Sequence, residues 1–234
     1  MSEPALIPPL GGEVVTDSPE RRLEILSEHD DLHATWSRVG PRREGADLHV
    51  HRHHADVFYV LDGELTIRLG VDDEQVAVPV GTLAVVPPLV VHGFRNASDA
   101  DVAYLNLHAP GMRFADYLRA LRDGRAFSYD QEEPPADGGR PTTEALLGVA
   151  SVEVDAVGIS VASFAPQEPA AAPQVPARHR RSFYVLEGEL ALTFAGRELR
   201  AAAGSWVQVP AGVAPAVAAA GSEPVRFLDV RTQP

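Results

Sequence analysis

The chain has 234 residues, no cysteine, and a formal net charge of −13 that comes from 33 acidic and 20 basic residues. This length has room for two domains of about 100 residues each. The acidic balance argues against binding to nucleic-acid phosphates, and the lack of cysteine excludes disulfides and thiol catalysis. No apolar run approaches the roughly 20 residues of a membrane span, and residues 1–13 lack the features of a secretory signal. We therefore expect a cytoplasmic protein with no nucleic-acid or membrane partner.

All 20 basic residues are arginine, which excludes chemistry through a lysine Schiff base. Together with the frequent alanine and proline, this bias favours a bacterial source. The 19 glycines and 20 prolines suit many short strands that are joined by turns.

The first half of the chain has the pattern of short strands. Residues 57–61 and 83–86 are apolar runs, and in residues 65–69 apolar and polar side chains alternate as in a half-buried strand. Asp62-Gly63, between residues 57–61 and 65–69, is a hairpin signal. The pattern predicts an antiparallel barrel or sandwich.

One helix is expected after these strands, over residues 112–122. Phe114, Leu118 and Leu121 recur there at helical spacing, and Gly124 can end the helix. Residues 131–143, rich in proline, glycine and acidic side chains, have the composition of a linker.

The second half of the chain repeats the first. Residues 58–65 (FYVLDGEL) and 183–190 (FYVLEGEL) differ at one position, and residues 81–87 align with 204–210. A full-length repeat predicts two domains of one fold. We expect an N-terminal arm at 1–19, a first domain at 20–126, a linker at 127–143 and a second domain at 144–234.

Histidines and a carboxylate gather in the first copy. His49 and His51 lie on one face of an extended strand, Asp56 belongs to the next strand, and His92 follows later. Imidazole and carboxylate ligands together suit a divalent transition metal, and the residues leave open Fe, Mn, Ni, Zn and Cu.

The spacing of these residues resembles the first motif of the cupin superfamily. It reads His49-x-His51, four residues, Asp56, six residues, Gly63. The family usually has glutamate at the position of Asp56, and its matching positions bind a metal. The resemblance therefore implies a metal site made of His49, His51, Asp56 and His92. Asp56 is shorter than glutamate, so it binds directly, binds through a water, or leaves a three-histidine site.

The second cupin motif is Gly, five residues, Pro-x-Gly, two residues, His, three residues, Asn. Gly81, Pro87, His92 and Asn96 match it at every spacing, with Leu89 in place of the second glycine. The surrounding sequence resembles quercetinase-like cupins. The resemblance implies an all-β fold of two tandem jelly-roll barrels.

The resemblance also implies a metal-dependent dioxygenase that acts on a small enolic or phenolic, flavonol-like molecule. Asp56 is then a ligand, a catalytic base, or both. A metal-dependent isomerase or cyclase and a non-catalytic small-molecule sensor are the alternatives, and a homodimer is left open. The expected substrate-pocket residues are Phe58, Val60, Phe94 and Asn96.

The second copy lacks the metal-binding side chains. The positions of His49, His51, Asp56 and His92 are taken by Gln174, Pro176, Arg181 and Pro215. We therefore expect one metal per chain, in the first domain. Arg178, Arg180 or Arg181 could instead hold a carboxylate or phosphate.

Two further groups of residues each allow two interpretations. His53 and His54 are either rim residues or, in a shifted frame, part of the ligand set. The alternating residues Tyr104, Asn106 and His108 could face the pocket, but their counterparts occupy the same face in the metal-free copy. We therefore expect them on a sheet face at an interface or in solvent.

Overall fold

The computed structural model describes residues 4–149, 151–154, 157–165, 180–194 and 196–232. It is 56% strand and 6% helix, so the all-β prediction is confirmed. The chain forms two compact units, Glu13–Val154 and, together, Met1–Gly12 and Asp155–Pro234. Among the described residues, no helix has the length and apolar character needed to cross a membrane.

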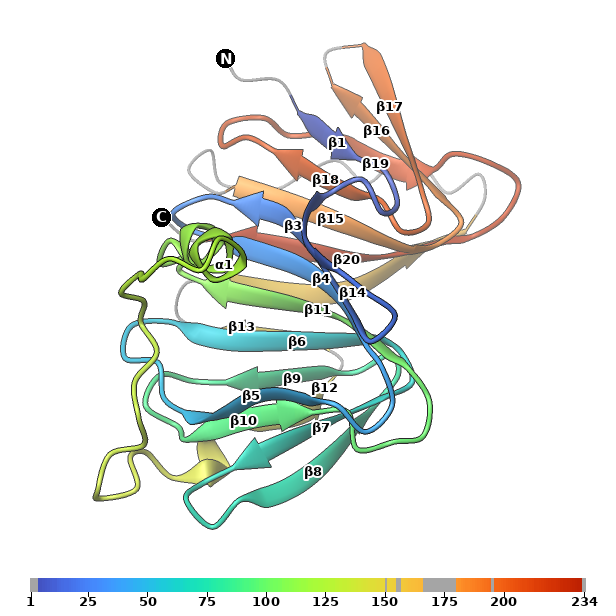
Figure 1. The fold of residues 1–234 in the computed structure, drawn as a ribbon. Helices are drawn as coiled ribbons and strands as arrows, with labels where there is room; N and C mark the ends of the chain where they lie inside the picture. The colour runs from blue at the N-terminus through green and yellow to red at the C-terminus, as the bar shows by residue number, and fades with distance from the viewer. Residues whose placement is uncertain (1–3, 150, 155–156, 166–179, 195, 233–234) are drawn as a thin grey trace. The chain divides into compact units, whose positions relative to one another are not determined.

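The first unit contains two antiparallel sheets that form a barrel (Figure 1). The larger sheet has the order β12 (Leu146–Val149), β9 (Leu83–Val86), β6 (Ala55–Asp62), β11 (Val102–Ala109), β4 (His33–Val39), β3 (Arg21–Glu28), β2 (Glu13–Asp17). The smaller sheet has the order β5 (Glu44–His49), β10 (His92–Arg95), β7 (Glu64–Leu69), β8 (Glu74–Pro79). A short 3-10 helix, η1 (Thr142–Glu144), precedes β12, and β13 (Ser151–Val154) follows it.

The second unit repeats this arrangement. One sheet contains, in order, β1 (Ala5–Ile7), β18 (Trp206–Val209), β15 (Arg180–Glu187), β20 (Val225–Thr232), β14 (Val157–Phe164). The other has the order β17 (Arg197–Ala202), β16 (Glu189–Phe194), β19 (Ala216–Ala219).

The chain is divided between the units differently from the expected boundaries. β1 lies in the segment expected as a free arm, yet it pairs with β18, where Ala5 lies opposite Gln208. It thereby covers an edge of that sheet. The division falls after Val154, beyond the expected linker, and β12 pairs with β9 of the first unit.

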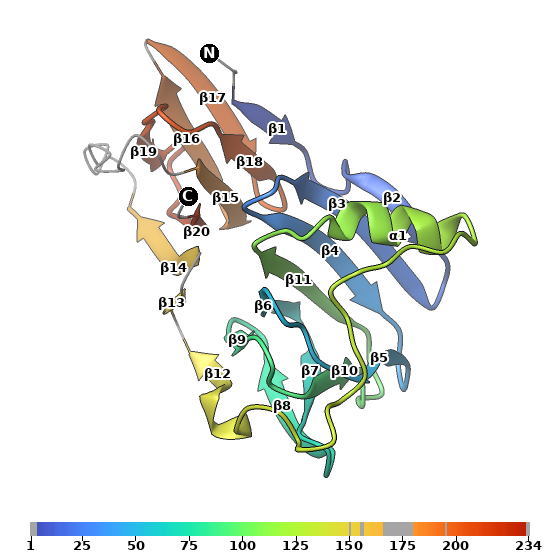
Figure 2. The ribbon, with the colours of Figure 1, turned by 90° about the vertical axis from the view of Figure 1, so that its left-hand side faces the viewer.

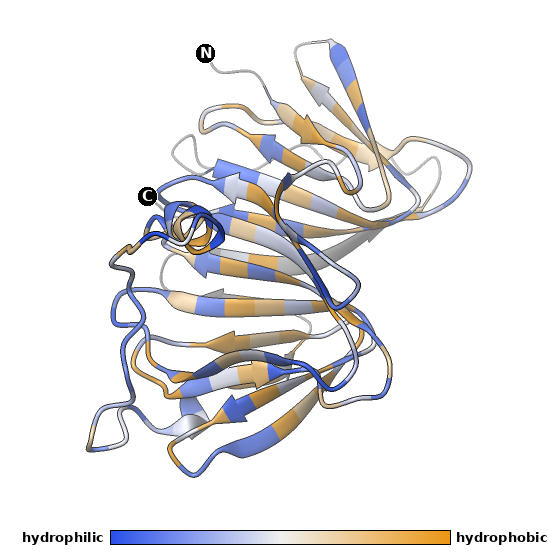
Figure 3. Ribbon diagram, viewed as in Figure 1, coloured by the Kyte–Doolittle hydropathy of each residue, from blue (hydrophilic) through white to orange (hydrophobic). Residues whose placement is uncertain are grey.

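The two barrels have matching hydrophobic cores. Phe58 and Val60 on β6 correspond to Phe183 and Val185 on β15, and all four are fully buried. The strands of both units carry alternating hydrophobic and hydrophilic bands (Figure 3), the period-two pattern of a sheet with one buried face. The internal repeat thus encodes two equivalent cores.

The glycine of the hairpin has a structural role in both copies. Gly63 and Gly188 have φ angles of 72° and 75°, in the left-handed region that favours glycine. A Cβ atom at these positions would collide with the backbone carbonyl oxygens of Asp101 and Pro224, respectively. Both copies therefore keep the residue independently of any chemistry.

The predicted helix is confirmed as α1 (Phe114–Arg122). It begins two residues later than expected, because Met112 and Arg113 have positive φ angles of 47° and 61°. Gly124, with φ 65°, follows its end as predicted. Figure 2 shows α1 lying over β2 and β3, onto which it packs a buried face.

A buried ion pair occupies the second barrel at the position that corresponds to Asp56. Arg181 donates from Nε and Nη2 to the two carboxylate oxygens of Asp229, each at 2.7 Å. Arg231 donates to the same carboxylate at 2.6 Å. Arg181 is therefore already paired, contrary to its expected use as a ligand clamp, and Arg178 lies outside the described residues.

Replacing Asp229 should destabilise the second unit. Asp229→Ala leaves the buried Arg181 without a counter-charge, which costs about 3 kcal/mol. Urea unfolding in a Trp36→Phe background would measure this, because the remaining Trp206 is fully buried in that unit. Glu198→Ala is the control, since its partner Arg200 is half exposed and such pairs contribute below about 1 kcal/mol. Equal losses in the two variants would contradict the prediction.

Candidate metal centre

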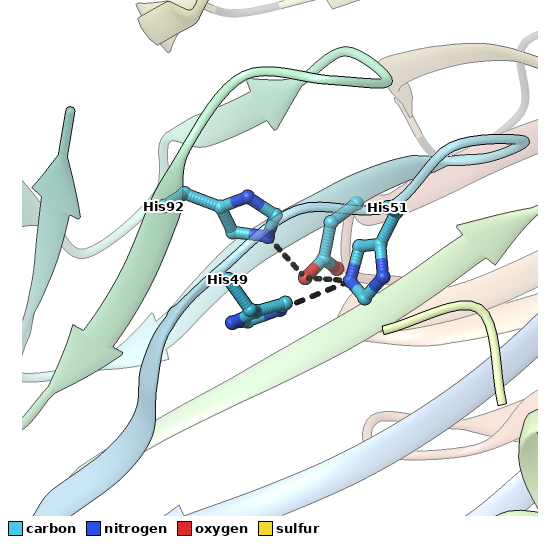
Figure 4. A group of neighbouring side chains, drawn as sticks. His49, His51 and His92 are labelled. Carbon is cyan, nitrogen blue, oxygen red and sulfur yellow. Dashed lines mark hydrogen bonds and ion pairs between the residues drawn. The ribbon is translucent and has the colours of Figure 1, made fainter. Parts of the chain in front are cut away.

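The four residues expected to bind a metal lie together in the first barrel. His49, His51, Asp56 and His92 are buried, and one potential ligand atom of each lies within 4.8 Å of the others. His49 ends β5 and pairs directly with His92, which begins β10. Figure 4 shows the imidazoles of His49, His51 and His92 converging on one point. The fold thus brings together residues that are up to 43 positions apart (92 − 49).

The spacing of the donor atoms fits a single ion. The Nε2 atoms of His49 and His51 are 3.1 Å apart, and Asp56 Oδ2 lies 3.4 Å from His92 Nε2 and 3.8 Å from His51 Nε2. Donor atoms that share a metal at about 2.1 Å lie about 3.0–3.4 Å from one another. The cluster can therefore hold a metal with little rearrangement.

Hydrogen bonds to backbone carbonyls set the tautomer of all three histidines. The Nδ1 atoms of His49 and His92 each donate to the carbonyl two residues earlier, at 2.7 and 2.9 Å. His51 Nδ1 donates to the carbonyl of Asp130. A carbonyl only accepts, so each Nδ1 carries the proton and each Nε2 presents its lone pair to the cluster.

The charges of the cluster also suit a cation. Burial, followed by the neighbouring His92 and His51, lowers the pKa of His49 to about 3, so this ring is neutral at neutral pH. Burial acts to raise the pKa of the Asp56 carboxyl, but His108 and the ligand histidines outweigh it and hold this pKa well below its ordinary value. The site therefore combines the carboxylate of Asp56 with the neutral imidazole of His49.

Two residues from β11 orient Asp56. Asn106 Nδ2 donates to Asp56 Oδ1, and His108 Nε2 lies 3.3 Å from the same oxygen. The other oxygen, Oδ2, faces His51 and His92. One carboxylate oxygen is thus held by the protein and the other is directed at the cluster.

A segment expected within the linker helps to build this site. Residues 126–140, which we call the strap, pair with the site through a bridge between Val50 and Glu132. Asp130 in the strap accepts from the backbone N–H groups of Arg52 and His53, at 3.0 and 2.8 Å. Its own carbonyl holds His51, so the strap is a wall of the cluster.

The strap also starts a hydrogen-bonded chain into the barrel. Asp130 Oδ2 lies 2.8 Å from His54 Nδ1, and Tyr129 Oη lies 3.0 Å from His54 Nε2 and 2.5 Å from His108 Nδ1. His108 Nε2 lies 3.0 Å from Asn106 Oδ1. Burial lowers the pKa of His108 although Asp56 acts in the opposite direction. The chain thus connects the strap carboxylate with the residues that hold Asp56.

The cluster lies at one end of a cavity of about 330 Å³ in the first barrel. The polar lining includes His49, His51, Asp56, Asn106, His108, Tyr104, Ser37, Thr35 and Arg21. The apolar lining includes Leu23, Val39, Phe94, Phe114, Leu118 and Leu121. A cavity of this size with convergent polar groups is typical of a small-molecule site.

The expected pocket residues are only partly in this cavity. Phe94 lines it, whereas Phe58 and Val60 belong to the hydrophobic core. Asn96 ties a turn together, because its Nδ2 donates to three backbone carbonyls, at 3.0, 2.9 and 2.7 Å. His53 is exposed, and its backbone N–H donates to Asp130 of the strap.

The interpretation of Tyr104, Asn106 and His108 as a solvent or interface face is wrong. All three are buried and line the cavity. The comparison of the two copies was misleading, because the second barrel also places a charged residue inward at a matching position, the buried Asp229. Tyr129 and Asp130 had no signal in the sequence, because only the folded strap brings them to the site.

Leu89 adopts the backbone conformation of the glycine that it replaces in the second motif. This residue has φ 67°, a conformation that favours glycine. Its N–H donates to the His51 carbonyl at 2.7 Å, and its own carbonyl accepts from Arg140 at 2.9 Å. These bonds hold the leucine in the glycine conformation beside the cluster.

Comparison with known proteins supports the fold. The cupin domain family matches residues 35–108 and 160–231. No curated protein matches the chain by sequence. Escherichia coli YlbA is similar in structure, with 14% identity over 98% of this chain and 90% of that chain and a TM-score of 0.68.

Two further solved structures are similar. Oxalate decarboxylase from Lactobacillus farciminis shares 13% identity over 98% of this chain and 86% of that chain, with a TM-score of 0.67. AerE from Microcystis aeruginosa shares 16% identity over 94% of this chain and 96% of that chain, with a TM-score of 0.64. At such identities the likeness shows the fold alone. The family match covers more than half of the sequence in two repeats, and the chain therefore belongs to the cupin family as a tandem, two-barrel member.

Proposed function

We propose that this chain is a metal-dependent enzyme that acts on a small enolic or phenolic molecule, with a dioxygenase reaction as the leading candidate. One divalent transition metal binds His49, His51, Asp56 and His92. The observation that carries the proposal is the convergence of three imidazole lone pairs and one carboxylate oxygen at the inner end of a cavity of about 330 Å³.

The bound metal supplies Lewis acidity toward an enolic oxygen and, for a redox-active ion, electron transfer. The protein supplies orientation and a dry surrounding. Phe94, Phe114 and Leu118 line the cavity with apolar surface, which favours a planar aromatic or enolic substrate and excludes water from the reacting atoms.

The lowered pKa of Asp56 favours its role as a ligand over its role as a base. An efficient general base has a pKa near the working pH, whereas Asp56 is held well below its ordinary value. His108 lines the cavity and is linked through Tyr129 to the strap, so it is the candidate to relay a substrate proton.

A second candidate is proton-transfer chemistry, such as isomerisation or cyclisation. The chain from Asp130 through His54 and Tyr129 to His108 favours it, because linked donors and acceptors can move a proton between the strap and the substrate. A redox-inert metal would suffice for this reaction.

Purified protein should contain one metal equivalent per chain. His51→Ala should abolish this content, because it removes a converging lone pair, whereas His53→Ala should leave it unchanged, because that side chain is exposed. Inductively coupled plasma analysis measures the result. The shifted ligand frame pairs His51 with His53, so loss of metal in His53→Ala together with retention in His49→Ala would support that frame instead.

Asn106→Leu should weaken metal binding by about 10–100-fold, the usual effect of removing a hydrogen bond to a ligating group. The variant removes the donor that holds Asp56 Oδ1. Competition against a chelating dye measures the affinity. Ser37→Ala, a change in the same cavity away from the cluster, should have no effect. Equal affinity of wild type and Asn106→Leu would show that Asp56 needs no such support.

Oxygen uptake should follow addition of a suitable flavonol, diketone or catechol to protein loaded with Fe, Mn, Ni or Cu. Zinc-loaded protein should consume no oxygen, and His51→Ala should be inactive with every metal. An oxygen electrode and product analysis by mass spectrometry measure the reaction. Turnover without oxygen, also with zinc, would identify proton-transfer chemistry, and tight binding without turnover would identify a sensor.

A further inference from the structure

The cavity has a second polar end, opposite the metal cluster. Arg21, Ser37 and Tyr104 line it from three neighbouring strands, β3, β4 and β11. Tyr104 lies opposite Ser37 in the sheet. Arg21 lies opposite Val39, two residues further along β4 on the same inward face. Three donor side chains therefore meet on one wall of the cavity.

Arg21 differs from every other arginine of the first unit. Each of the other twelve has a carboxylate oxygen within 4.0 Å. In the part of the chain that the structure describes, no ion pair involves Arg21. Its Nη2 donates to the backbone carbonyl of Glu44 at 2.5 Å. The carboxylate of Glu44 instead pairs with Arg68 and Arg95.

This difference is informative because carboxylates are abundant. The chain has 33 acidic residues and a net charge of −13, so an arginine at a cavity wall has many potential partners within the protein. The guanidinium fork matches a carboxylate in a planar, two-bond geometry. A ligand that brings its own carboxylate would complete the pairing that the protein makes for its other arginines.

The two polar ends are well separated. Along β11, His108 lies opposite Asp56 at the metal end, and Val102, opposite Val39, marks the level of Arg21. The level of Arg21 is six residues from His108 (108 − 102), or roughly 20 Å along the strand, and Tyr104 lies between them, four residues (108 − 104) or roughly 13 Å from His108. A ligand that reaches both ends must be elongated, with its oxygen donors at one end and its charge at the other.

We propose that the substrate is an elongated carboxylate, whose carboxylate group binds Arg21, Ser37 and Tyr104 while its enolic or phenolic oxygens reach the cluster. The inference deepens the proposed function, since both use the same cavity. It names the substrate class and makes Arg21 the residue that selects for it.

A graded series of alkyl hydroxamates tests the proposal by binding alone. The hydroxamate group chelates the metal, and the tail ends in a carboxylate or in its neutral methyl ester. Calorimetry with zinc-loaded protein measures both affinities at each chain length. We expect the acid to bind about tenfold or more tightly than the ester at one optimal length, as for a charge-assisted pair.

Arg21→Gln should remove the preference for the acid and leave the affinity for the ester unchanged. Tyr104→Phe should reduce the preference in part. Arg38→Gln is the matched control, because Arg38 lies on β4 but pairs with Asp101 at 3.0 Å outside the cavity. The Arg38→Gln variant should prefer the acid over the ester as strongly as wild type does. Thermal unfolding checks that each variant is folded.

The outcomes separate this inference from the proposed function. Equal binding of acid and ester to wild type, or a preference that survives Arg21→Gln, would overturn the role of Arg21 while leaving the metal site intact. Failure of every hydroxamate to bind zinc-loaded protein would count against the metal site itself and therefore against both proposals.

Discussion

The candidate site depends on hydrogen bonds from Nδ1 of each histidine, the ring nitrogen on the side away from the cluster. Each histidine of the cluster donates from Nδ1 to a backbone carbonyl, so its Nε2 faces the cluster and its ring cannot rotate freely. A neutral imidazole without such a bond could protonate at either nitrogen. The orientation of the three rings therefore follows from the backbone of the barrel and of the strap.

The strap is a structural part of the first barrel, although its composition resembles that of a flexible linker. Residues 126–140 are rich in proline, glycine and acidic side chains, and a flexible connection has the same composition. In the structure, Asp130 accepts from two backbone N–H groups and from His54, and its carbonyl holds His51. A change in this segment would therefore alter the metal cluster without touching a ligand.

The two barrels stabilise a buried carboxylate in different ways. Both place polar side chains inward from the strand pairs β6–β11 and β15–β20. In the first barrel Asp56 is held by Asn106 and can face a cation, whereas in the second Arg181 supplies the positive charge for Asp229. The second barrel thus satisfies its buried carboxylate internally.

Local patterns in the sequence determined most of the fold and the ligand set. The repeat, the period-two alternation and the turn glycines predict two β-barrels, because these features depend on neighbours along one strand. The cluster of His49, His51, Asp56 and His92 was expected because the spacing of these residues resembles the two cupin motifs. Only the tertiary structure showed which side chains support it. Asp130 reaches the cluster, and Arg21 reaches the cavity, through contacts between segments far apart in the chain, and no local pattern records such contacts.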